Sequence, residues 1–520
     1  MSRAVVLSCL LLVHHAASLN ILAIISMPLR SHYMAFKPLF RELATRGHNV
    51  TVMNNFPDEE PLQNLTFFNL HNSNLARLPP LRDQEDSSSA LWYLQNYIKH
   101  TFKGKKFIGT DCENLFTKTN AHRADEVNYD VIFVEQFLSD CGLAYAAAFY
   151  DAPIIGITSH VMLPWAYPRL GIPFDVSADP FYFTVKKFEK SLFQKVEDSV
   201  LHFWFTTIGR WWLQTGLYAE LAPHLLRAVD LEQAARDRMR MMFVYQHHSL
   251  TGARLTAPQV LDIGGIHIGD VTAVPKDIED FLSTADHGAI YFSFGSNLQL
   301  SSMTPKKMRV FLDAFNRLPQ KVLWKWENDT FPAGFEGKIY PKRWFPQLDV
   351  LCHPKVIAFV SHGGMLSLSE AAHCGTPVLA MPFFGDQFSN AGLVVSSGLG
   401  NMLMFDSFND VDLANAVREL TSLKVQQNAK RISKLWHDRP QNVMDSAIYW
   451  TEYVARHDSA PFALPTQHRT WFENLQLDVS VTLFLLLSSL VSFCYVILKL
   501  FVLFLAKLYK LFCTKKLKKN

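Results

Sequence analysis

The chain has 520 residues, more than a single hydrophobic core usually organises, so two domains of ordinary size are expected. Lysine and arginine number 50 and aspartate and glutamate 47, which leaves a formal net charge of +3. Such a balanced charge gives no reason to expect nucleic acid as a partner.

Residues 1–18 have the pattern of a secretory signal peptide. Arg3 supplies the positive charge, an apolar run over residues 4–13 follows, and small residues up to Ser18 resemble a cleavage site. The alternative is a buried first strand or helix, but residues 20–26 already form a complete apolar strand. We therefore predict a cleaved signal peptide.

Short apolar strands alternate with helical patterns in both halves of the chain. In residues 19–263 the predicted elements are a strand at 20–26, a helix around 36–44, strands at 49–53 and 129–134, a helix at 143–149 and a strand at 153–158. After a linker over residues 264–275, the region 276–440 has predicted strands at 289–294, 321–325, 356–360 and 377–381, and helices at 305–318 and from 365. Such units build parallel sheets, in an α/β fold, whose ligands bind at the carboxyl ends of the strands.

An aromatic segment interrupts this alternation at residues 203–205 and 211–212. It fits a helix lying on a membrane surface, a part of the core, or the lining of a ligand pocket. We favour the core or pocket interpretation.

The C-terminal end contains an uncharged apolar run at residues 479–498, about the 20 residues that span a bilayer. Lysines follow it from Lys499 to Lys519, so residues 499–520 are predicted to be a basic cytosolic tail and the body luminal, in type I topology. The last residues, 516–520, resemble the dilysine retrieval signal of endoplasmic reticulum membrane proteins. The alternative is a simple stop-transfer cluster of charges.

Four cysteines lie between these two terminal segments: Cys112, Cys141, Cys352 and Cys374. They are too few for a disulfide scaffold, and their spacing does not match a zinc site, so no metal site is predicted.

The residues His362-Gly363-Gly364 stand where a predicted strand passes into a helix. Glycines at such a junction let backbone N–H groups approach an anion, and the helix N-terminus adds its dipole. Ser367 falls in the first helical turn, where its hydroxyl can reach a phosphate oxygen. This pattern predicts a diphosphate site.

Three nearby residues suit a nucleoside. Glu370, one turn further along the helix, can accept hydrogen bonds from ribose hydroxyls, and Trp344 offers a flat face to a base. Gln347 is near enough in sequence to bind the edge of that base. Each feature alone is common, but their combination at these spacings is specific.

The stretch 344–391 resembles the signature of the UDP-glycosyltransferase family, with weaker likeness over residues 21–453. The resemblance implies a GT-B fold of two facing Rossmann-like domains, with residues 441–460 forming a helix that returns to the N-terminal domain. It implies a UDP-sugar as co-substrate without a further cofactor. It assigns Trp344 and Gln347 to uridine, His362 and Ser367 to the diphosphate, Glu370 to ribose, and Asp386 with Gln387 to the sugar hydroxyls.

Leu366 departs from the family pattern. Many relatives have asparagine there, and leucine cannot bind a phosphate, so another residue must replace that contact. Ser296, after a predicted strand end, is our candidate.

Transfer requires a base, and histidine is best matched in pKa near neutrality. The family's base follows the first strand, where this chain has His32, and its acidic partner matches Glu135 at the end of a later strand. Asp140 is a less favoured partner, and Glu135 alternatively only caps the next helix. Attack opposite UDP by a hydroxyl would invert the anomeric centre.

Two other classes of function remain as alternatives. A catalytically silent UDP-sugar-binding or regulatory partner would keep residues 344–387 but not need His32. A metal-dependent transferase would need an Asp-x-Asp motif, but Asp410 and Asp412 precede a helix and fit capping residues.

The substrates are less well defined. UDP-glucose is favoured because no basic residue stands beside Asp386, and residues 57–240 suit a small lipophilic acceptor. Asn64 and Asn328 lie in predicted loops and are candidate glycosylation sites, whereas Asn49 lies in a strand. The sequence leaves homo- or hetero-oligomerisation open.

Overall fold

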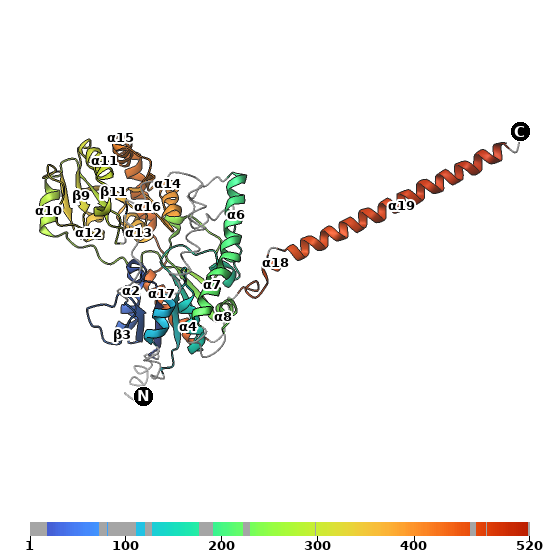
Figure 1. Cartoon of the computed structure of the whole chain (residues 1–520), viewed down its shortest axis with the longest axis horizontal. Coiled ribbons are helices and arrows are strands. Elements are labelled where there is room, and N and C mark those ends of the chain that lie inside the picture. Colours follow the sequence, from blue (N-terminus) through green and yellow to red (C-terminus); the bar gives the residue numbers. More distant parts are fainter. Residues whose placement is uncertain are drawn as a thin grey trace, which may run out of the picture. The chain divides into compact units, whose positions relative to one another are not determined.

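The computed structural model describes residues 18–71, 81, 111–119, 127–175, 191–221, 229–296, 298–457, 464–474 and 476–517. The chain divides into two compact units, residues 1–463 and 464–520, and each is considered by itself (Figure 1). All of the predicted signal peptide except Ser18 lies outside the described residues, as does much of the region expected to bind the acceptor.

The first unit contains two parallel sheets, each with helices packed around it. Among the described residues, the first sheet has seven strands in the order β3-β2-β1-β4-β5-β6-β7. These are β1 (Asn20–Ile25), β2 (Asn49–Asn54), β3 (Leu65–Asn69), β4 (Val131–Glu135), β5 (Ile154–Thr158), β6 (Met239–Val244) and β7 (Val260–Asp262). The strand order reverses at β1, which pairs with both β2 and β4.

The second sheet has six described strands in the order β10-β9-β8-β11-β12-β13, again all parallel. They are β8 (Ala289–Ser293), β9 (Lys321–Lys325), β10 (Ile339–Lys342), β11 (Val356–Ser361), β12 (Val378–Ala380) and β13 (Gly400–Met402). Here the order reverses at β8, between β9 and β11. Both reversals create a crevice at the carboxyl ends of the strands, the usual ligand site of this architecture.

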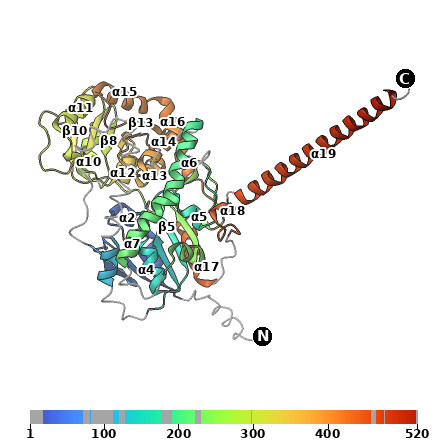
Figure 2. The same cartoon turned by 45° about the vertical axis from the view of Figure 1, so that its right-hand side comes forward.

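Helices cover the faces of each sheet, which explains why the central strands are apolar along their whole length. Around the first sheet lie α2 (Arg30–Thr45), α4 (Cys141–Phe149), α5 (Ala166–Arg169), α6 (Leu192–Thr206), α7 (Ile208–Leu221), α8 (Leu231–Arg238) and α9 (His248–Thr251). The second sheet has α10 (Lys276–Ser283), α11 (Pro305–Asn316), α12 (Gln347–Cys352), α13 (Met365–Cys374), α14 (Gln387–Ser397), α15 (Asp410–Leu420) and α16 (Leu423–His437). Figures 1 and 2 both show the lobe with α10, α11 and α15 apart from the lobe with α2 and α4.

The helix α17 (Val443–Arg456) follows the second sheet in sequence but packs on the first, against α2 and β4 (Figure 2). Arg46 at the end of α2 pairs with Asp445 at 2.6 Å. His48 contacts Glu452 at 3.4 Å. These contacts join the last described helix of the unit to its first domain.

The aromatic segment corrects one expectation. Phe205 is buried, as predicted, but the side chain of Phe203 is 52% exposed and that of Trp211 is 64% exposed. The reason is that α6 and α7 carry apolar side chains on more than one face, and only one of those faces meets the core. Burial in the core is therefore right for Phe205 and wrong for Phe203 and Trp211, and the pocket interpretation stays a prediction.

The four cysteines form two disulfides, which the sequence analysis did not predict. Cys112 is bonded to Cys141 at the start of α4, and Cys352 at the end of α12 to Cys374 at the end of α13. Each bridge therefore joins two helices within one domain.

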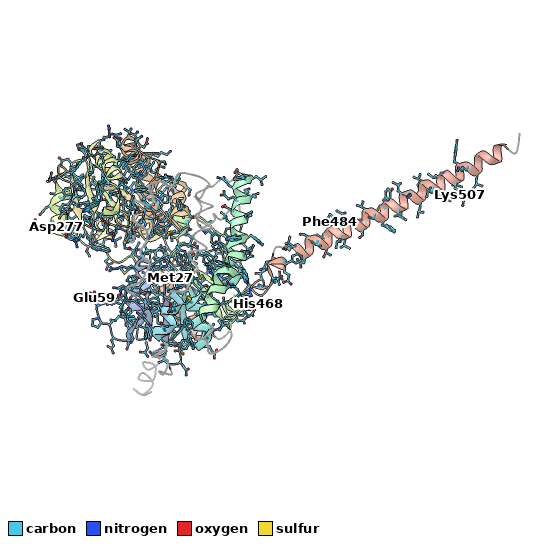
Figure 3. The ribbon with its side chains drawn as sticks, viewed as in Figure 1. Met27, Glu59, Asp277, His468, Phe484 and Lys507 are labelled. Atoms are coloured by element: carbon cyan, nitrogen blue, oxygen red, sulfur yellow. A yellow bond between two sulfur atoms is a disulfide. The ribbon has the colours of Figure 1, made fainter. Side chains whose placement is uncertain are left out.

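The second unit consists of α18 (Trp471–Asn474) and α19 (Leu477–Leu517). Residues 477–511 of α19 contain an 18-residue window with a mean hydropathy of 2.4, and the helix is long and apolar enough to cross a membrane. Side chains such as Phe484 and Lys507 project outward from it (Figure 3). The helix runs on beyond the predicted span at 479–498 into the lysine-rich tail.

Candidate functional site

The reversal at β1 brings His32 and Glu135 into direct contact. His32 lies in the first turn of α2, directly after β1, and Glu135 is the last residue of the neighbouring β4. The Nδ1–H of His32 donates a hydrogen bond to Oε1 of Glu135. Both residues are more than nine-tenths buried. Because the carboxylate holds the ring proton at Nδ1, Nε2 keeps the lone pair that a general base needs.

The alternative partner, Asp140, is engaged elsewhere. It accepts two hydrogen bonds of 3.0 Å from Arg169 and also pairs with Arg210. Burial by itself raises the pKa of Asp140, but these two guanidinium groups outweigh it and hold the pKa at about 2. Asp140 is thus part of a buried structural network.

An apolar wall and a second histidine flank His32. The ring of Phe137 meets the imidazole edge-on, with 4.6 Å between centroids. His160 lies 5.9 Å away. Burial, and next the nearby His32, lower the pKa of His160 to about 3, and its Nδ1–H donates to the carbonyl of Val161 at 2.7 Å. His160 is therefore neutral near pH 7 and does not compete with His32 as a cationic partner for Glu135.

The reversal at β8 forms a glycine-lined cradle around His362. A Cβ atom at Gly364 would lie 2.4 Å from Nε2 of His362, and one at Gly295 would lie 2.7 Å from its Cε1. Only glycine at both positions leaves space for the ring. Gly363 has φ +82°, a backbone conformation that side chains disfavour. Together these glycines expose the N-terminus of α13, as the sequence predicted.

The imidazole of His362 is neutral and has an unused donor. Burial, assisted by the positive charge of Lys325, lowers the pKa of His362 to about 4. Its buried Nδ1 has no hydrogen-bond partner among the described residues. An anion placed in the cradle could satisfy that nitrogen, which is why the residues present fit a diphosphate.

Gln347, Ser367 and Glu370 are brought together from two helices. Gln347 begins α12, and its Nε2 donates to Ser367 Oγ at 2.9 Å and to Glu370 Oε2 at 2.5 Å. The oxygen Oε1 of Gln347 accepts a hydrogen bond from Tyr291 at 3.4 Å. These three residues, expected at the uridine, ribose and phosphate, form one connected polar cluster.

Residues 22–518 match the protein family described as "UDP-glucoronosyl and UDP-glucosyl transferase". The chain belongs to the UDP-glycosyltransferase family. It is 32% identical to "UDP-glycosyltransferase UGT5" of Dactylopius coccus over 97% of both chains, and 29% identical to "UDP-glucosyltransferase 2" of the same organism over 92% of both. The structure of CalG4, "the Calicheamicin Glycosyltransferase", superposes with a TM-score of 0.56 at 16% identity, over 85% of this chain and 99% of that one.

This membership makes the chain a glycosyltransferase that takes its sugar from a UDP-sugar. The structural likeness, with two parallel sheets, identifies the fold as GT-B, as predicted. The C-terminal apolar helix α19 completes the predicted architecture as a candidate membrane anchor.

Asp386, which the sequence assigns to the sugar hydroxyls, lies within electrostatic range of His32. Burial raises the pKa of Asp386 to about 6, while the hydrogen bond from Asn390 and the charge of His32 act in the opposite direction. Asn390 Nδ2 donates to Asp386 at 2.7 Å and to the carbonyl of Gly363 at 2.9 Å. The two domains thus bring the carboxyl group of Asp386 close to His32.

Gln387 is placed differently from the expectation of a free sugar-binding amide. It is 3% exposed, and its Oε1 accepts hydrogen bonds from the backbone N–H groups of Phe383 at 2.9 Å and Phe384 at 3.3 Å. Its oxygen therefore holds the loop before α14, and only its amide nitrogen is available to another group.

Trp344 remains accessible, as a residue that stacks on a base must be. Its side chain is 60% exposed. Two cations lie by its ring, with Arg30 Cζ at 6.0 Å and Lys325 Nζ at 5.9 Å from the centroid. Arg30 comes from the first domain, so both domains contribute to this end of the site.

Lys325 is a residue that the sequence analysis missed. It ends β9, and its Nζ donates to the carbonyl of Gly295 at 2.5 Å and lies 3.6 Å from Glu327. Leu366, in contrast, packs against the hydrophobic core. The signal that could have indicated Lys325 was a lysine at the carboxyl end of the strand 321–325, directly after its apolar residues 322–324.

His267 was also missed. It lies in the segment between the domains, 3.4 Å from Oε1 of Glu370, and its Nδ1 is hydrogen-bonded to the hydroxyl of Tyr245. No motif marks it in the sequence, because its neighbours in space are distant in the chain.

The remaining predicted residues lie in exposed positions. Ser296 follows the cradle residue Gly295 in a turn, and Asn64 and Asn328 lie in an exposed turn and loop. Asp412 accepts a hydrogen bond from the backbone of Asn409 in a capping box, as the capping interpretation of Asp410 and Asp412 predicted.

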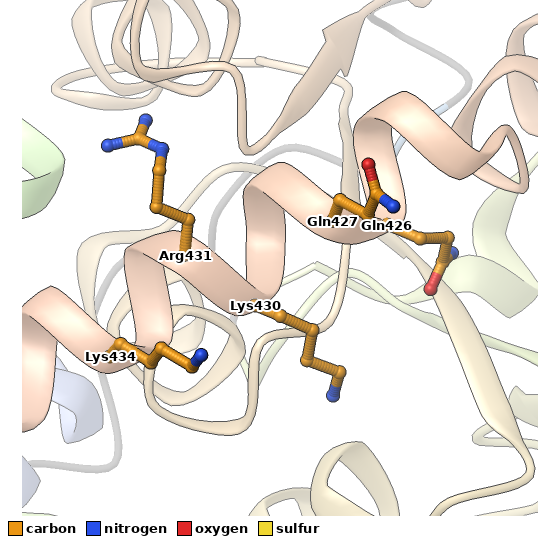
Figure 4. Close-up of a pocket in the computed structure, with 5 residues that line it drawn as sticks. All are labelled: Gln426, Gln427, Lys430, Arg431 and Lys434. Atoms are coloured by element: carbon orange, nitrogen blue, oxygen red, sulfur yellow. The ribbon is translucent and has the colours of Figure 1, made fainter.

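A surface depression of about 410 Å³ lies apart from this site, on α16. It is lined by Gln426, Gln427, Lys430, Arg431 and Lys434, whose side chains point in different directions (Figure 4). Lys430 donates to the carbonyl of Cys374 at 3.0 Å and Arg431 to Asn428 at 2.8 Å. Side chains that do not converge give no reason to assign a ligand.

Proposed function

We propose that the protein transfers a sugar from a UDP-sugar to a hydroxyl of a small lipophilic acceptor, with inversion, using His32 as the base and Glu135 as its partner. The observation that carries this proposal is the buried hydrogen bond from His32 to Glu135 at the strand reversal. Nε2 of His32 takes the proton from the acceptor hydroxyl while its oxygen attacks the anomeric carbon. Glu135 stabilises the imidazolium that results.

The leaving UDP acquires negative charge as the glycosidic bond breaks. We propose that the N-terminus of α13, the free donor of His362 and the ammonium group of Lys325 stabilise it. Lys325 thereby replaces the contact that asparagine makes at the position of Leu366 in relatives, in addition to Ser296. No step of this mechanism requires a group beyond the chain's own residues and the two substrates.

UDP-glucose is the donor that the site favours. The family description names both glucuronosyl and glucosyl transfer. Asp386, at the proposed sugar end, carries a carboxyl group and is hydrogen-bonded to the neutral Asn390. A second carboxylate, that of glucuronate, would be repelled there, whereas neutral hydroxyls can donate to Asp386. The apolar ring of Phe137 beside the base suits a lipophilic acceptor.

We propose that the body lies in the lumen of the endoplasmic reticulum, anchored by α19. The two disulfides support this location, because such bonds persist in oxidising compartments and are rare in the cytosol. The apolar helix with lysines at its C-terminal end supports the membrane anchor and its orientation.

The test is a UDP-release assay on permeabilised microsomes that contain the full chain. UDP-glucose, UDP-glucuronate and UDP-galactose are supplied separately with a mixture of phenols and steroid alcohols. We expect turnover with UDP-glucose, its loss in His32→Ala, and full turnover in the control His287→Ala, whose side chain is exposed. Unchanged turnover in His32→Ala contradicts the assigned base. UDP binding without turnover in the wild type favours the alternative, a silent UDP-sugar-binding partner.

A further inference from the structure

Asp111 has a buried carboxyl group that the proposed mechanism does not use, close to the proposed catalytic pair of His32 and Glu135. Residues 111–119 are helical, and Asp111 is the first of the described residues in this helix. Its side chain is 4% exposed. No positively charged group is among the interactions that shift its pKa. A buried carboxyl group without such a cation is costly and calls for a specific role.

Asp111 links the two chain segments that carry the pair. Ser26, the residue after β1, donates its hydroxyl to Asp111 Oδ2 at 3.0 Å. The hydroxyl of Ser139, in the loop that follows β4, is also hydrogen-bonded to Asp111. Ser139 Oγ accepts the backbone N–H of Cys141 at 3.1 Å, so its own hydrogen is free for the carboxyl.

These two serines stand close in sequence to the catalytic pair. Ser26 belongs to the connection between β1 and α2 that leads to His32, and Ser139 to the loop that begins after Glu135. One carboxyl group therefore connects the loops whose spacing determines whether His32 and Glu135 meet.

A covalent bond holds Asp111 in this place. Its neighbour Cys112 is bonded to Cys141, the first residue of α4, with 5.1 Å between their Cα atoms. The bridge fixes the start of the helix 111–119 beside the loop that contains Ser139. Its geometry leaves Asp111 little freedom to move away from that loop.

The electrostatics agree with this proximity. Burial raises the pKa of Asp111 to about 7, the two serine hydroxyls act against burial, and the charge of Glu135 raises it further. The charge of Glu135 thus acts on Asp111, as their closeness in the fold requires.

We propose that Asp111 is a positioning residue for the reaction: it ties the loop that leads into the helix of His32 to the loop that follows Glu135, and the Cys112–Cys141 disulfide holds it there. This inference rests on the proposed function, because it presupposes that His32 and Glu135 form the base. In this proposal Asp111 acts through its hydrogen bonds to Ser26 and Ser139 and takes no part in the chemical step. Its loss changes the geometry of the pair while the nucleotide site stays intact.

The first experiment compares Asp111→Ala and Asp111→Asn in the full chain by UDP-release kinetics. We expect Asp111→Ala to lower kcat roughly tenfold to a hundredfold with an unchanged KM for the UDP-sugar, because small misplacements of reacting groups have effects of this size. Asn keeps one carbonyl oxygen as an acceptor, so its kcat should lie between those of Asp111→Ala and the wild type. If Asp111→Ala does not fold, Ser26→Ala takes its place, because it removes one of the two hydrogen bonds to Asp111. It should likewise lower kcat and leave the KM for the UDP-sugar unchanged.

The second disulfide provides a matched control. Cys352–Cys374 joins the helix that begins with Gln347 to the helix that carries Ser367. Replacing both of these cysteines by alanine should raise the KM for the UDP-sugar and leave kcat unchanged. Replacing Cys112 and Cys141 by alanine should lower kcat and leave the KM for the UDP-sugar unchanged. The inference is wrong if the two pairs of substitutions change kcat and the KM for the UDP-sugar in the same way.

His32→Ala, measured in parallel, separates the two proposals. If His32→Ala is inactive and Asp111→Ala keeps wild-type kcat, the role of Asp111 is overturned and the base is upheld. If His32→Ala is fully active, the proposed function itself fails. A fall in kcat accompanied by an equal loss of UDP affinity would show that Asp111 supports the fold in general, which also overturns the inference.

Discussion

The two domains of this glycosyltransferase place different kinds of groups at equivalent points of the same architecture. In the first sheet the reversal between β1 and β4 presents two titratable side chains, His32 and Glu135, in a direct hydrogen bond. In the second sheet the reversal between β8 and β11 presents backbone: the glycines around His362 and the N-terminus of α13. The comparison teaches that one fold offers titratable side chains at one reversal and free backbone at the other, which suits the proposed division into chemistry and anion binding.

The two regions also differ in what they can tolerate. The first depends on the identity and protonation of two side chains, so isosteric changes should affect turnover. The second depends on the absence of side chains at Gly295 and Gly364, so the addition of one methyl group should affect binding. Substitutions in the two regions should therefore separate kcat from KM.

The largest effect is expected in the first region, from Glu135→Gln. The amide cannot stabilise an imidazolium, so kcat should fall roughly 10²- to 10⁴-fold while the KM for the UDP-sugar is unchanged. Glu59→Gln, at an exposed position of the same domain, is the control in the UDP-release assay. If the KM for the UDP-sugar rose by a factor comparable to the fall in kcat, the proposed separation of catalysis and UDP-sugar binding between the two domains would be contradicted.

The next effect is expected in the second region, from Gly364→Ala. Its Cβ would stand 2.4 Å from Nε2 of His362 and displace the ring. UDP affinity should fall by roughly one order of magnitude or more, the loss expected for a charge-assisted hydrogen bond. Calorimetric titration with UDP checks this, with Gly269→Ala as control, because no atom lies within 4 Å of a Cβ there. Equal affinities of the two variants would contradict the cradle.

A smaller effect should follow from Trp344→Ala. Loss of the ring that is 60% exposed removes the surface proposed to stack on uracil. UDP should bind about two- to tenfold more weakly, the range that aromatic pairs usually contribute. Trp344→Phe should restore most of the affinity. If Phe and Ala are equally weak, the indole contributes through something other than stacking.

The smallest effect concerns pH and stability. Burial is the main cause that lowers the pKa of His160 to about 3 and that of His362 to about 4, so the folded state binds fewer protons than the unfolded state between those values and 6.5. The free energy of unfolding should therefore rise with pH over that window, by at most about 1.4 kcal/mol per pH unit for each histidine.

Thermal unfolding of the detergent-solubilised protein between pH 4.5 and 7 measures this effect. His160→Gln and His362→Gln should each flatten the dependence of Tm on pH, one variant for each domain. His287→Gln, at an exposed position, should leave the dependence as it is. Equal slopes in all variants would show that neither buried imidazole contributes.

The sequence predicted the central strands of both sheets and the nucleotide motif because their signals are local. The strand at 20–26 differs from β1 by one residue, and the junction at His362-Gly363-Gly364 lies where it was expected. It did not name the edge strands β3, β7, β10 and β13, which have weak patterns, nor the internal strand β6, whose apolar run is interrupted by Arg240. The exposed part of α6 was misassigned because an apolar residue in a helix gives no sign of which face meets the core.

The site shows the same division. His32 and Glu135 could be proposed from their positions after two strands, but their hydrogen bond depends on the parallel pairing of β1 with β4. Three contacts of the site join residues that are not neighbours in the sequence. They are those of Lys325 with Trp344, of His267 with Glu370, and of Gln347 with Glu370. The sequence motif placed Gln347 and Glu370 in one site without predicting their hydrogen bond, and no motif marks Lys325 or His267.

By itself the sequence determined the alternation of strands and helices, the apolar terminal segments and the glycine junction, because periodicity and backbone freedom are properties of neighbouring residues. Only the tertiary structure decided which carboxyl group faces His32, that Leu366 packs into the core beside a site served by Lys325, and that the cysteines pair as two bridges. These outcomes depend on strand order and on helix packing. Both are set by the burial of the whole domain and by no segment alone.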